Sequence, residues 1–253
     1  KSFNIEAYAK KEGTCGTYNY CTILSKGGTG LKGFGFAIYG GKLHLRLNDT
    51  GADSAQYLTG TTTLSDNTWY YIAAVVDGTS KSIKLYLNGN LEATGQYKDT
   101  ISYGTEVVKI GNSNGGNDLP FNGVLDDVKF SNIAKDSSYI QSAYNKYSNG
   151  VYNSPIMTLG GVQNVTLSYT ASGLKTTDGE TPYSTTGLVA QWNFNEASGT
   201  TAVSGGTCGT SCNGTLTNFA STGSRDAAIM SGWTANNGRW GSGALMFDGS
   251  NDY

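Results

Sequence analysis

The chain has 253 residues and a formal net charge of −2, and charged side chains make up 14% of it. This length suits one large β domain or two small domains, and the weak charge provides no basic surface of the kind that binds nucleic acid. With 36 glycines, 17 tyrosines and no apolar run long enough to span a membrane, the composition predicts short β-strands joined by glycine and asparagine turns.

Residues 2–11 predict the first strand. Four apolar side chains alternate with more polar neighbours, with Phe3, Ile5, Ala7 and Ala9 on one side and Asn4, Glu6, Tyr8 and Lys10 on the other. A period of two places these two sets on opposite faces of a strand. We therefore expect one buried face and one solvated face.

Four cysteines occur as two close pairs, Cys15 with Cys21 and Cys208 with Cys212. Neither pair has the two-residue spacing of the commonest zinc half-sites, and the single histidine, His44, lies in another segment. Two local disulfides are therefore favoured over a zinc site. Disulfides indicate an oxidising environment, which is extracellular or at the cell surface.

Residues 31–49 predict a hairpin that turns at Gly40 and Gly41. In its second arm, leucines at every other position face inward, which leaves His44 and Arg46 on the outer side. A catalytic histidine needs an orienting partner, and the sequence indicates none here. We interpret His44 as a solvent-side strand residue.

The segment 121–132 predicts a strand on which Val124, Asp126, Val128 and Phe130 share one face. A carboxylate among apolar neighbours needs a cation or several hydrogen-bond donors. Asp126 is therefore either a hydrogen-bonded turn anchor or a ligand of a structural calcium ion. Its neighbour Asp127 is expected to face solvent.

Residues 134–150 predict a short helix at the end of a domain. Aromatic and apolar side chains recur there at helical spacing after a Ser or Asp cap: Tyr139, Ile140, Ala143, Tyr144 and Tyr147.

Near the end of the chain, Leu188, Ala190, Trp192 and Phe194 alternate with smaller or polar residues and give a strand with one heavy apolar face. The residues that follow supply only a few short strands. We therefore expect this strand to join the sheet formed by the first 147 residues.

The segments SFNIEAYAKK, TILSKG, TWYYIAAVVDGTSKSIKLYLNG, VVKIGN and FNGVLDDVKFSNIAKDSSYIQSAYN together resemble the laminin-G-like domains of the concanavalin A-like lectin/glucanase superfamily, of the type found in prokaryotic surface proteins. The resemblance covers about residues 1–147. It implies an all-β fold, an antiparallel β-sandwich of the jelly-roll type.

A second resemblance involves GLVAQWNFNEASGTTA, NGTLTN and RWGSGALMFDGSNDY, which are similar to the first part of the same domain type. The family order would place residues 187–253 before residue 1. We therefore divide the chain into residues 1–150, the later part of the fold, residues 151–186, a linker that could hold an extra strand, and residues 187–253, the earlier part.

Three arrangements satisfy this order. The two parts pair within one chain as a permuted fold, they belong to successive domains of a longer protein, or residues 187–253 complete the sheet of a neighbouring copy by strand exchange. The third arrangement would build a head-to-tail filament.

The resemblance also bears on calcium. In calcium-binding relatives of this fold, side chains of the opening strand and the next loop meet a carboxylate like Asp126. The matching positions here are Asn195 and Glu196, but SGGTCGTSCNG replaces the acidic loop that would follow. Our hypothesis is that the Cys208–Cys212 bridge holds the loop that calcium would otherwise order.

No ExDxxE pattern is present, and the adjacent Asp126 and Asp127 would point to opposite faces of their strand, which makes them a poor acid and base pair. No Ser/His/Asp set, metal-protease motif or phosphate-binding loop is present either, so an enzyme is not expected. Two functions remain. The first is an extracellular adhesion or carbohydrate-binding protein whose partner is a glycan or a surface protein. The second is a structural subunit that polymerises with copies of itself.

Aromatic rings that stack on sugars would serve the first function. Nine tyrosines lie on predicted outward faces or loops: Tyr8, Tyr18, Tyr20, Tyr39, Tyr57, Tyr70, Tyr86, Tyr97 and Tyr103. Tyrosine is also common in strands for structural reasons, so the sequence does not identify which of these side chains would bind a sugar.

Overall fold

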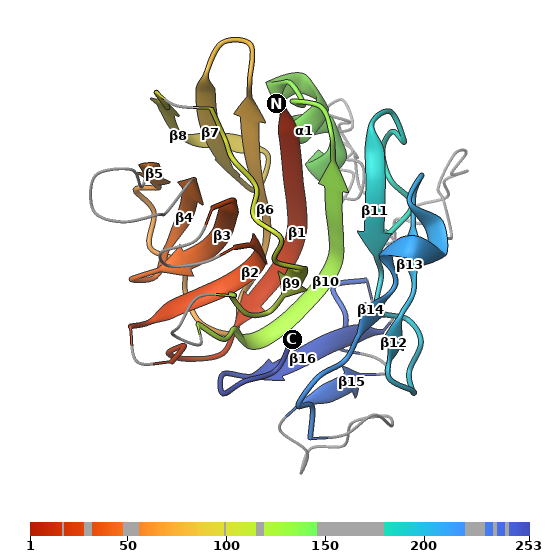
Figure 1. Cartoon of the computed structure of the whole chain (residues 1–253). Helices are drawn as coiled ribbons and strands as arrows, with labels where there is room; N and C mark the ends of the chain where they lie inside the picture. Colours follow the sequence, from red (N-terminus) through yellow and green to blue (C-terminus); the bar gives the residue numbers. More distant parts are fainter. Residues whose placement is uncertain are drawn as a thin grey trace, which may run out of the picture.

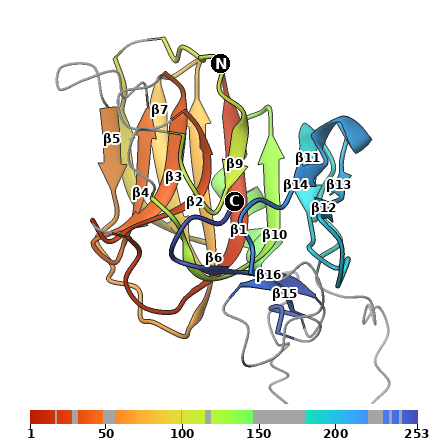
Figure 2. The same cartoon turned by 60° about the horizontal axis from the view of Figure 1, so that its bottom comes forward.

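The computed structural model describes residues 1–16, 18–27, 32–47, 56–98, 100–114, 119–145, 180–220, 231–234, 237–240 and 243–253. Two antiparallel sheets face each other across a shared core (Figure 1), and Figure 2 shows the two layers from another side. The predicted antiparallel β-sandwich is confirmed. The extra strand suggested for the linker lies outside the described residues.

Within the described residues, nine strands form the larger sheet. Seven of them follow one another in the order β13 (Ser204–Gly205), β11 (Leu188–Trp192), β10 (Asn122–Ser131), β1 (Phe3–Lys11), β6 (Trp69–Asp77), β7 (Ser82–Leu87) and β8 (Asn90–Gln96). The other two are β16 (Ala244–Asp248), which pairs with β10, and β15 (Gly232–Thr234), which pairs with β16.

The smaller sheet has five strands in the described part of the chain, in the order β5 (Gln56–Thr59), β4 (Lys42–Leu47), β3 (Phe34–Tyr39), β2 (Tyr20–Lys26) and β9 (Val108–Ile110). A separate short ladder joins β12 (Thr201–Ala202) to β14 (Gly214–Thr215), and the 3₁₀ turn Gly209–Cys212 lies between them in sequence. The predicted helix is confirmed as α1 (Ser137–Asn145), while Tyr147 lies outside the described residues.

The main core lies between the sheets. Alternation in the sequence correctly predicted the inward side chains of several strands. One buried cluster contains Phe3, Ile5, Ala7 and Ala9 of β1, Phe34, Phe36 and Ile38 of β3, and Leu43, Leu45 and Leu47 of β4. Removing this much apolar surface from water is the main force that holds the two sheets together.

The second face of β1 is buried too, so the prediction of a solvated face was wrong. Asn4, Glu6 and Tyr8 are at most 3% exposed. Helix α1 covers this side of the larger sheet, where Ile140 packs in one cluster with Tyr8. Local alternation could not show that a segment more than 120 residues later returns to cover the strand.

A β-bulge in β10 changes which residues share a face. The pairing of β1 with β10 shifts register between Glu6 and Tyr8, and Asp127 has a left-handed φ of 49°. Val128 therefore points into the main core, whereas Val124 belongs to a different cluster, with Met246. The prediction that Val124, Asp126, Val128 and Phe130 share one face was wrong, because it assumed unbroken alternation.

The late strands pair with β10 inside this chain. β11 lies antiparallel to the second half of β10, from Val128 to Ser131, and β16 lies antiparallel to its first half, from Asn122 to Leu125. Ala190, Trp192 and Phe194 contribute to the main core, while Leu188 is buried outside it. The larger sheet is thus built from one copy of the chain, and the filament alternative gains no support from this arrangement.

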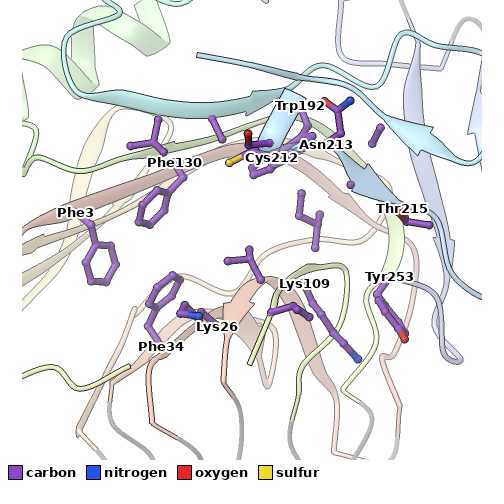
Figure 3. Close-up of a pocket in the computed structure, with 18 of the residues that line it drawn as sticks. Phe3, Lys26, Phe34, Lys109, Phe130, Trp192, Cys212, Asn213, Thr215 and Tyr253 are labelled. Atoms are coloured by element: carbon purple, nitrogen blue, oxygen red, sulfur yellow. Dashed lines mark hydrogen bonds between the residues drawn. The ribbon is translucent and has the colours of Figure 1, made fainter. Parts of the chain in front are cut away.

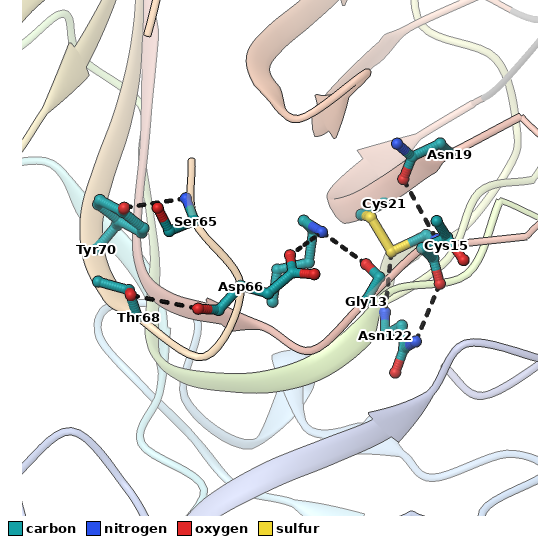
Figure 4. Close-up of polar contacts among 11 residues, drawn as sticks. Gly13, Cys15, Asn19, Cys21, Ser65, Asp66, Thr68, Tyr70 and Asn122 are labelled. Carbon is teal, nitrogen blue, oxygen red and sulfur yellow. Dashed lines mark hydrogen bonds and ion pairs between the residues drawn. A yellow bond between two sulfur atoms is a disulfide. The ribbon is translucent and has the colours of Figure 1, made fainter. Parts of the chain in front are cut away.

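Both cysteine pairs form disulfides, Cys15–Cys21 and Cys208–Cys212. Figure 4 shows the first among polar contacts at one end of the sandwich, where Asn122 donates its backbone N–H to Sγ of Cys15 over 3.2 Å and its amide Nδ2 to the carbonyl of Thr14 over 2.9 Å. These contacts tie the loop after β1 to the start of β10. No helix in the described residues is long and apolar enough to cross a membrane.

Candidate functional site

An aromatic surface lies on the outer face of the smaller sheet. Five side chains of β2, β3, β4 and β5 form it, and we call it the tyrosine platform: Tyr20, Tyr39, His44, Arg46 and Tyr57. Two of its rings reach far into solvent, since Tyr39 is 46% exposed and Tyr57 is 66% exposed. The leucines of β4 point into the core, which is why His44 and Arg46 point to this side.

His44 is the centre of the platform. Its ring centroid lies 5.3 Å from that of Tyr39, 5.6 Å from that of Tyr20 and 5.7 Å from that of Tyr57. Because these rings surround it, the side chain is only 5% exposed, and the prediction of a solvent-side histidine was wrong in this respect. The outward direction was right, but neighbouring strands supply a cover that β4 alone does not reveal.

Burial sets the charge of the platform. It lowers the pKa of His44 to about 4, and the nearby Arg46 guanidinium lowers it further in the same direction. The imidazole is therefore neutral at pH 7. Burial also raises the pKa of Tyr20 to about 12, so its hydroxyl stays protonated. Arg46, whose Cζ lies 5.5 Å from the Tyr20 ring centroid, supplies the positive charge.

This arrangement is suited to binding rather than to bond cleavage. The two exposed rings offer apolar faces, and the Arg46 guanidinium and the Thr59 hydroxyl add polar groups beside them. His44 has a hydrogen-bonding partner in Thr59, but a neutral ring that is nearly covered is poorly placed to exchange protons with a substrate.

The structure separates the nine predicted outward tyrosines into groups. Tyr8, Tyr20, Tyr86 and Tyr97 are buried, and Tyr70 and Tyr103 are half-buried. Only Tyr18, Tyr39 and Tyr57 of this set are well exposed. The signal that could have found the platform is the outward position of His44 and Arg46 on β4. Locating Tyr57 beside them required the pairing of β4 with β5, which the sequence does not show.

Each of the three calcium candidates accepts a backbone hydrogen bond. Asp126 is buried, and its Oδ2 accepts the backbone N–H of Arg239 over 2.8 Å. Oδ1 of Asn195 accepts the N–H of Gly243 over 2.9 Å, and Oε1 of Glu196 accepts the N–H of Val203 over 2.7 Å. Among the described residues, no group of three or more His, Cys, Asp and Glu side chains is placed to hold a metal ion.

Burial and the nearby Asp127 raise the pKa of Asp126 to about 8. Asp127 itself is 1% exposed, so the expectation that it faces solvent was wrong. The bulge turns its carboxylate inward, where Lys129 donates to one oxygen and Nε2 of Gln191 donates to the other over 2.7 Å. These contacts explain how a buried carboxylate is tolerated.

Comparisons with known proteins agree with this architecture. A candidate carbohydrate-binding protein from Bacteroides ovatus matches with a TM-score of 0.53 at 16% identity, over 80% of this chain and 49% of that one. The chain thus spans about half the length of that protein. The CBM40 domain of the Ruminococcus gnavus IT-sialidase, solved with α2,3-sialyllactose, matches with a TM-score of 0.49 at 18% identity, over 57% of this chain and 83% of that one.

A heptameric SAP-like pentraxin from Limulus polyphemus gives a TM-score of 0.44 at 21% identity, over 56% of this chain and 69% of that one. No curated protein sequence matches the chain.

The antiparallel sandwich is that of a concanavalin A-like jelly roll. The Laminin_G_3 model, described as the concanavalin A-like lectin/glucanases superfamily, matches residues 2–141, which is more than half of the chain. The chain therefore belongs to this family. The match ends before residue 187, so the resemblance of residues 187–253 to the first part of the domain stays a prediction.

Proposed function

We propose that this protein is a non-catalytic carbohydrate-binding protein and that the tyrosine platform is its glycan site. The observation that carries the proposal is the pair of exposed rings, Tyr39 and Tyr57, on either side of a buried neutral His44. The B. ovatus protein shares the fold and is described as a candidate carbohydrate-binding protein, which supports the same function for this chain.

The chemistry follows from the shape of a sugar ring. One face of a pyranose presents C–H groups, which pack on an aromatic ring, while its hydroxyls point outward around the edge. Tyr39 and Tyr57 would supply the rings. Arg46 would donate from its fixed fork of N–H groups to hydroxyl or carboxylate oxygens of the sugar, and Thr59 lies beside His44 as a further polar group.

The setting that we propose is extracellular or at the cell surface. Two disulfides support it, because such bonds persist in oxidising compartments. A binding protein of this kind would meet glycans on cells or in their surroundings, and it would leave them chemically unchanged.

A glycan array followed by calorimetry tests the proposal. The whole chain is screened first, and the strongest glycan is then titrated into the wild type and into Tyr39→Ala and Tyr57→Ala. We expect each substitution to weaken binding by roughly tenfold or more, as the loss of one aromatic contact of about 1.4 kcal/mol would do.

Tyr183→Ala is the matched control, because Tyr183 is 51% exposed but its ring packs on Tyr139, outside the platform. Its affinity should equal that of the wild type. Binding that survives both platform substitutions, or release of a shortened sugar during incubation, would contradict the proposal.

For calcium, we propose that the Cys208–Cys212 bridge orders the loop in the place of an ion. The carbonyl of Cys212 accepts the indole N–H of Trp192 over 3.0 Å, so the bridge is connected directly to β11. Asp126, Asn195 and Glu196 already accept backbone N–H groups, which would satisfy part of their hydrogen-bonding capacity without a metal.

A further inference from the structure

A large cavity lies between the two sheets at the edge marked by β9. Its volume is about 830 Å³, and it is lined by Val108 and Ile110 of β9 and by Ala190 and Trp192 of β11. In the described part of the chain the smaller sheet ends at β9, whereas the larger sheet continues past β10 to β11. The inward face of β11 therefore extends over a space that no described strand of the smaller sheet fills.

The walls of this cavity are apolar and aromatic. Figure 3 shows Phe3, Phe34 and Phe130 on one side and Trp192 above, and Phe194 and Phe247 also line the space. Its volume falls within the range of about 300–1,000 Å³ typical of small-molecule sites, which are also mostly apolar. A long apolar group that entered this cavity would be removed from contact with water, which is favourable.

The charged side chains around the cavity are all cationic among the described lining residues: Lys1, Lys26 and Lys109, with no Asp or Glu. None of the three forms an ion pair with a described carboxylate. Lys26 donates to the carbonyl of Glu106 over 2.6 Å, and the ammonium of Lys109 lies 3.6 Å from the ring centroid of Tyr253. These lysines leave their charge available to an anion.

We propose that this cavity is a second binding site, which takes one long-chain amphipathic anion of the fatty-acid type. The alkyl chain lies between the sheets against Trp192 and the phenylalanines, and the carboxylate lies at the lysines. The site is distinct from the tyrosine platform, because it uses the core side of the smaller sheet and the platform uses the outer side.

Titration with dodecanoate, below the concentration at which it forms micelles, tests the proposal on the whole chain. Trp192 is the tryptophan that lines the cavity among the described residues, so binding should change tryptophan fluorescence with saturation at one equivalent. Trp192→Phe should remove most of that change while calorimetry still detects binding. Dodecyltrimethylammonium, which has the same chain with a cationic head, should bind at least tenfold more weakly.

Charge reversal at one of the lining lysines gives a sharper test. Lys109→Glu should weaken dodecanoate binding at least tenfold, whereas Lys84→Glu, on β7 and outside the cavity, should leave it unchanged. Thermal melts of both variants confirm that they fold. The proposal is overturned if dodecanoate does not saturate, if anion and cation bind equally, or if both variants behave alike. It is also overturned if the particle mass doubles with concentration and dodecanoate cannot reverse this, since a second copy would then fill the cavity.

Discussion

Nδ1 of His44 lies 2.8 Å from the hydroxyl oxygen Oγ1 of Thr59, across the pairing of β4 with β5. This contact joins the only histidine of the sequence to the edge strand of the smaller sheet. It holds the imidazole in place beneath Tyr57, and it gives the buried ring a polar partner. The packing of the platform therefore depends on His44 being neutral.

The first prediction concerns pH. The pKa of His44 falls from 6.5 to about 4 on folding, so between these values the unfolded chain binds a proton that the folded chain does not. Stability should therefore fall as pH falls through this window, by a total on the order of 3 kcal/mol. His44→Phe should lose this part of the dependence. Urea unfolding of both proteins at pH 7, 5.5 and 4 measures the difference, and parallel profiles would contradict the burial of the neutral ring.

A second prediction tests whether β16 packs on the first part of the chain. A Cβ built at Gly111 would lie 2.0 Å from Cε1 of Phe247, and its φ is +79°. Gly111→Ala should therefore lower the free energy of unfolding by about 3 kcal/mol or more, because the Phe247 ring must move and the backbone at residue 111 is strained. Gly40→Ala is the matched control, since its φ is +56° but nothing lies within 4 Å of the added carbon. It should cost only about 1–2 kcal/mol. Equal losses of unfolding free energy in the two variants would contradict the packing of Phe247 against Gly111.

The sequence predicted the sandwich and most of its core because alternation is a local property of each strand. It failed at β10, where one extra residue, Asp127, reverses the faces and the pattern of letters gives no sign of it. It also failed on the outer face of β1, whose cover by α1 is a contact between distant segments. The platform was missed for the same reason, since its residues come from four strands.

The third prediction concerns the disulfides. Cys15 and Cys21 are fully buried, whereas Cys208 and Cys212 are half-buried, so a reductant should reach the second pair first. Treating the folded protein with dithiothreitol and then with iodoacetamide should label two cysteines, and peptide mass mapping should locate both at 208 and 212. Labelling of Cys15 or Cys21 at the same rate, while the protein remains folded, would show that the first pair is accessible.

The fourth prediction separates the disulfide from calcium as the element that orders residues 204–214. Dialysis against EDTA should leave the melting temperature unchanged, and added CaCl₂ should not raise it. Cys208→Ser combined with Cys212→Ser should lower stability by about 2 kcal/mol, the loop-entropy effect of so short a bridge. A large fall in melting temperature after EDTA treatment would contradict the account and would point to Asp126, Asn195 and Glu196 as ligands.

The most direct test of the glycan site uses the fact that the sequence contains a single histidine. Its imidazole gives one assignable set of NMR signals from the centre of the platform. The strongest glycan from the array is titrated into the protein while these signals and the Tyr ring signals are followed. Binding at the platform should shift the His44 signals with the same saturation curve that calorimetry gives. Saturable glycan binding that leaves the His44 signals unmoved would contradict the assignment of the site.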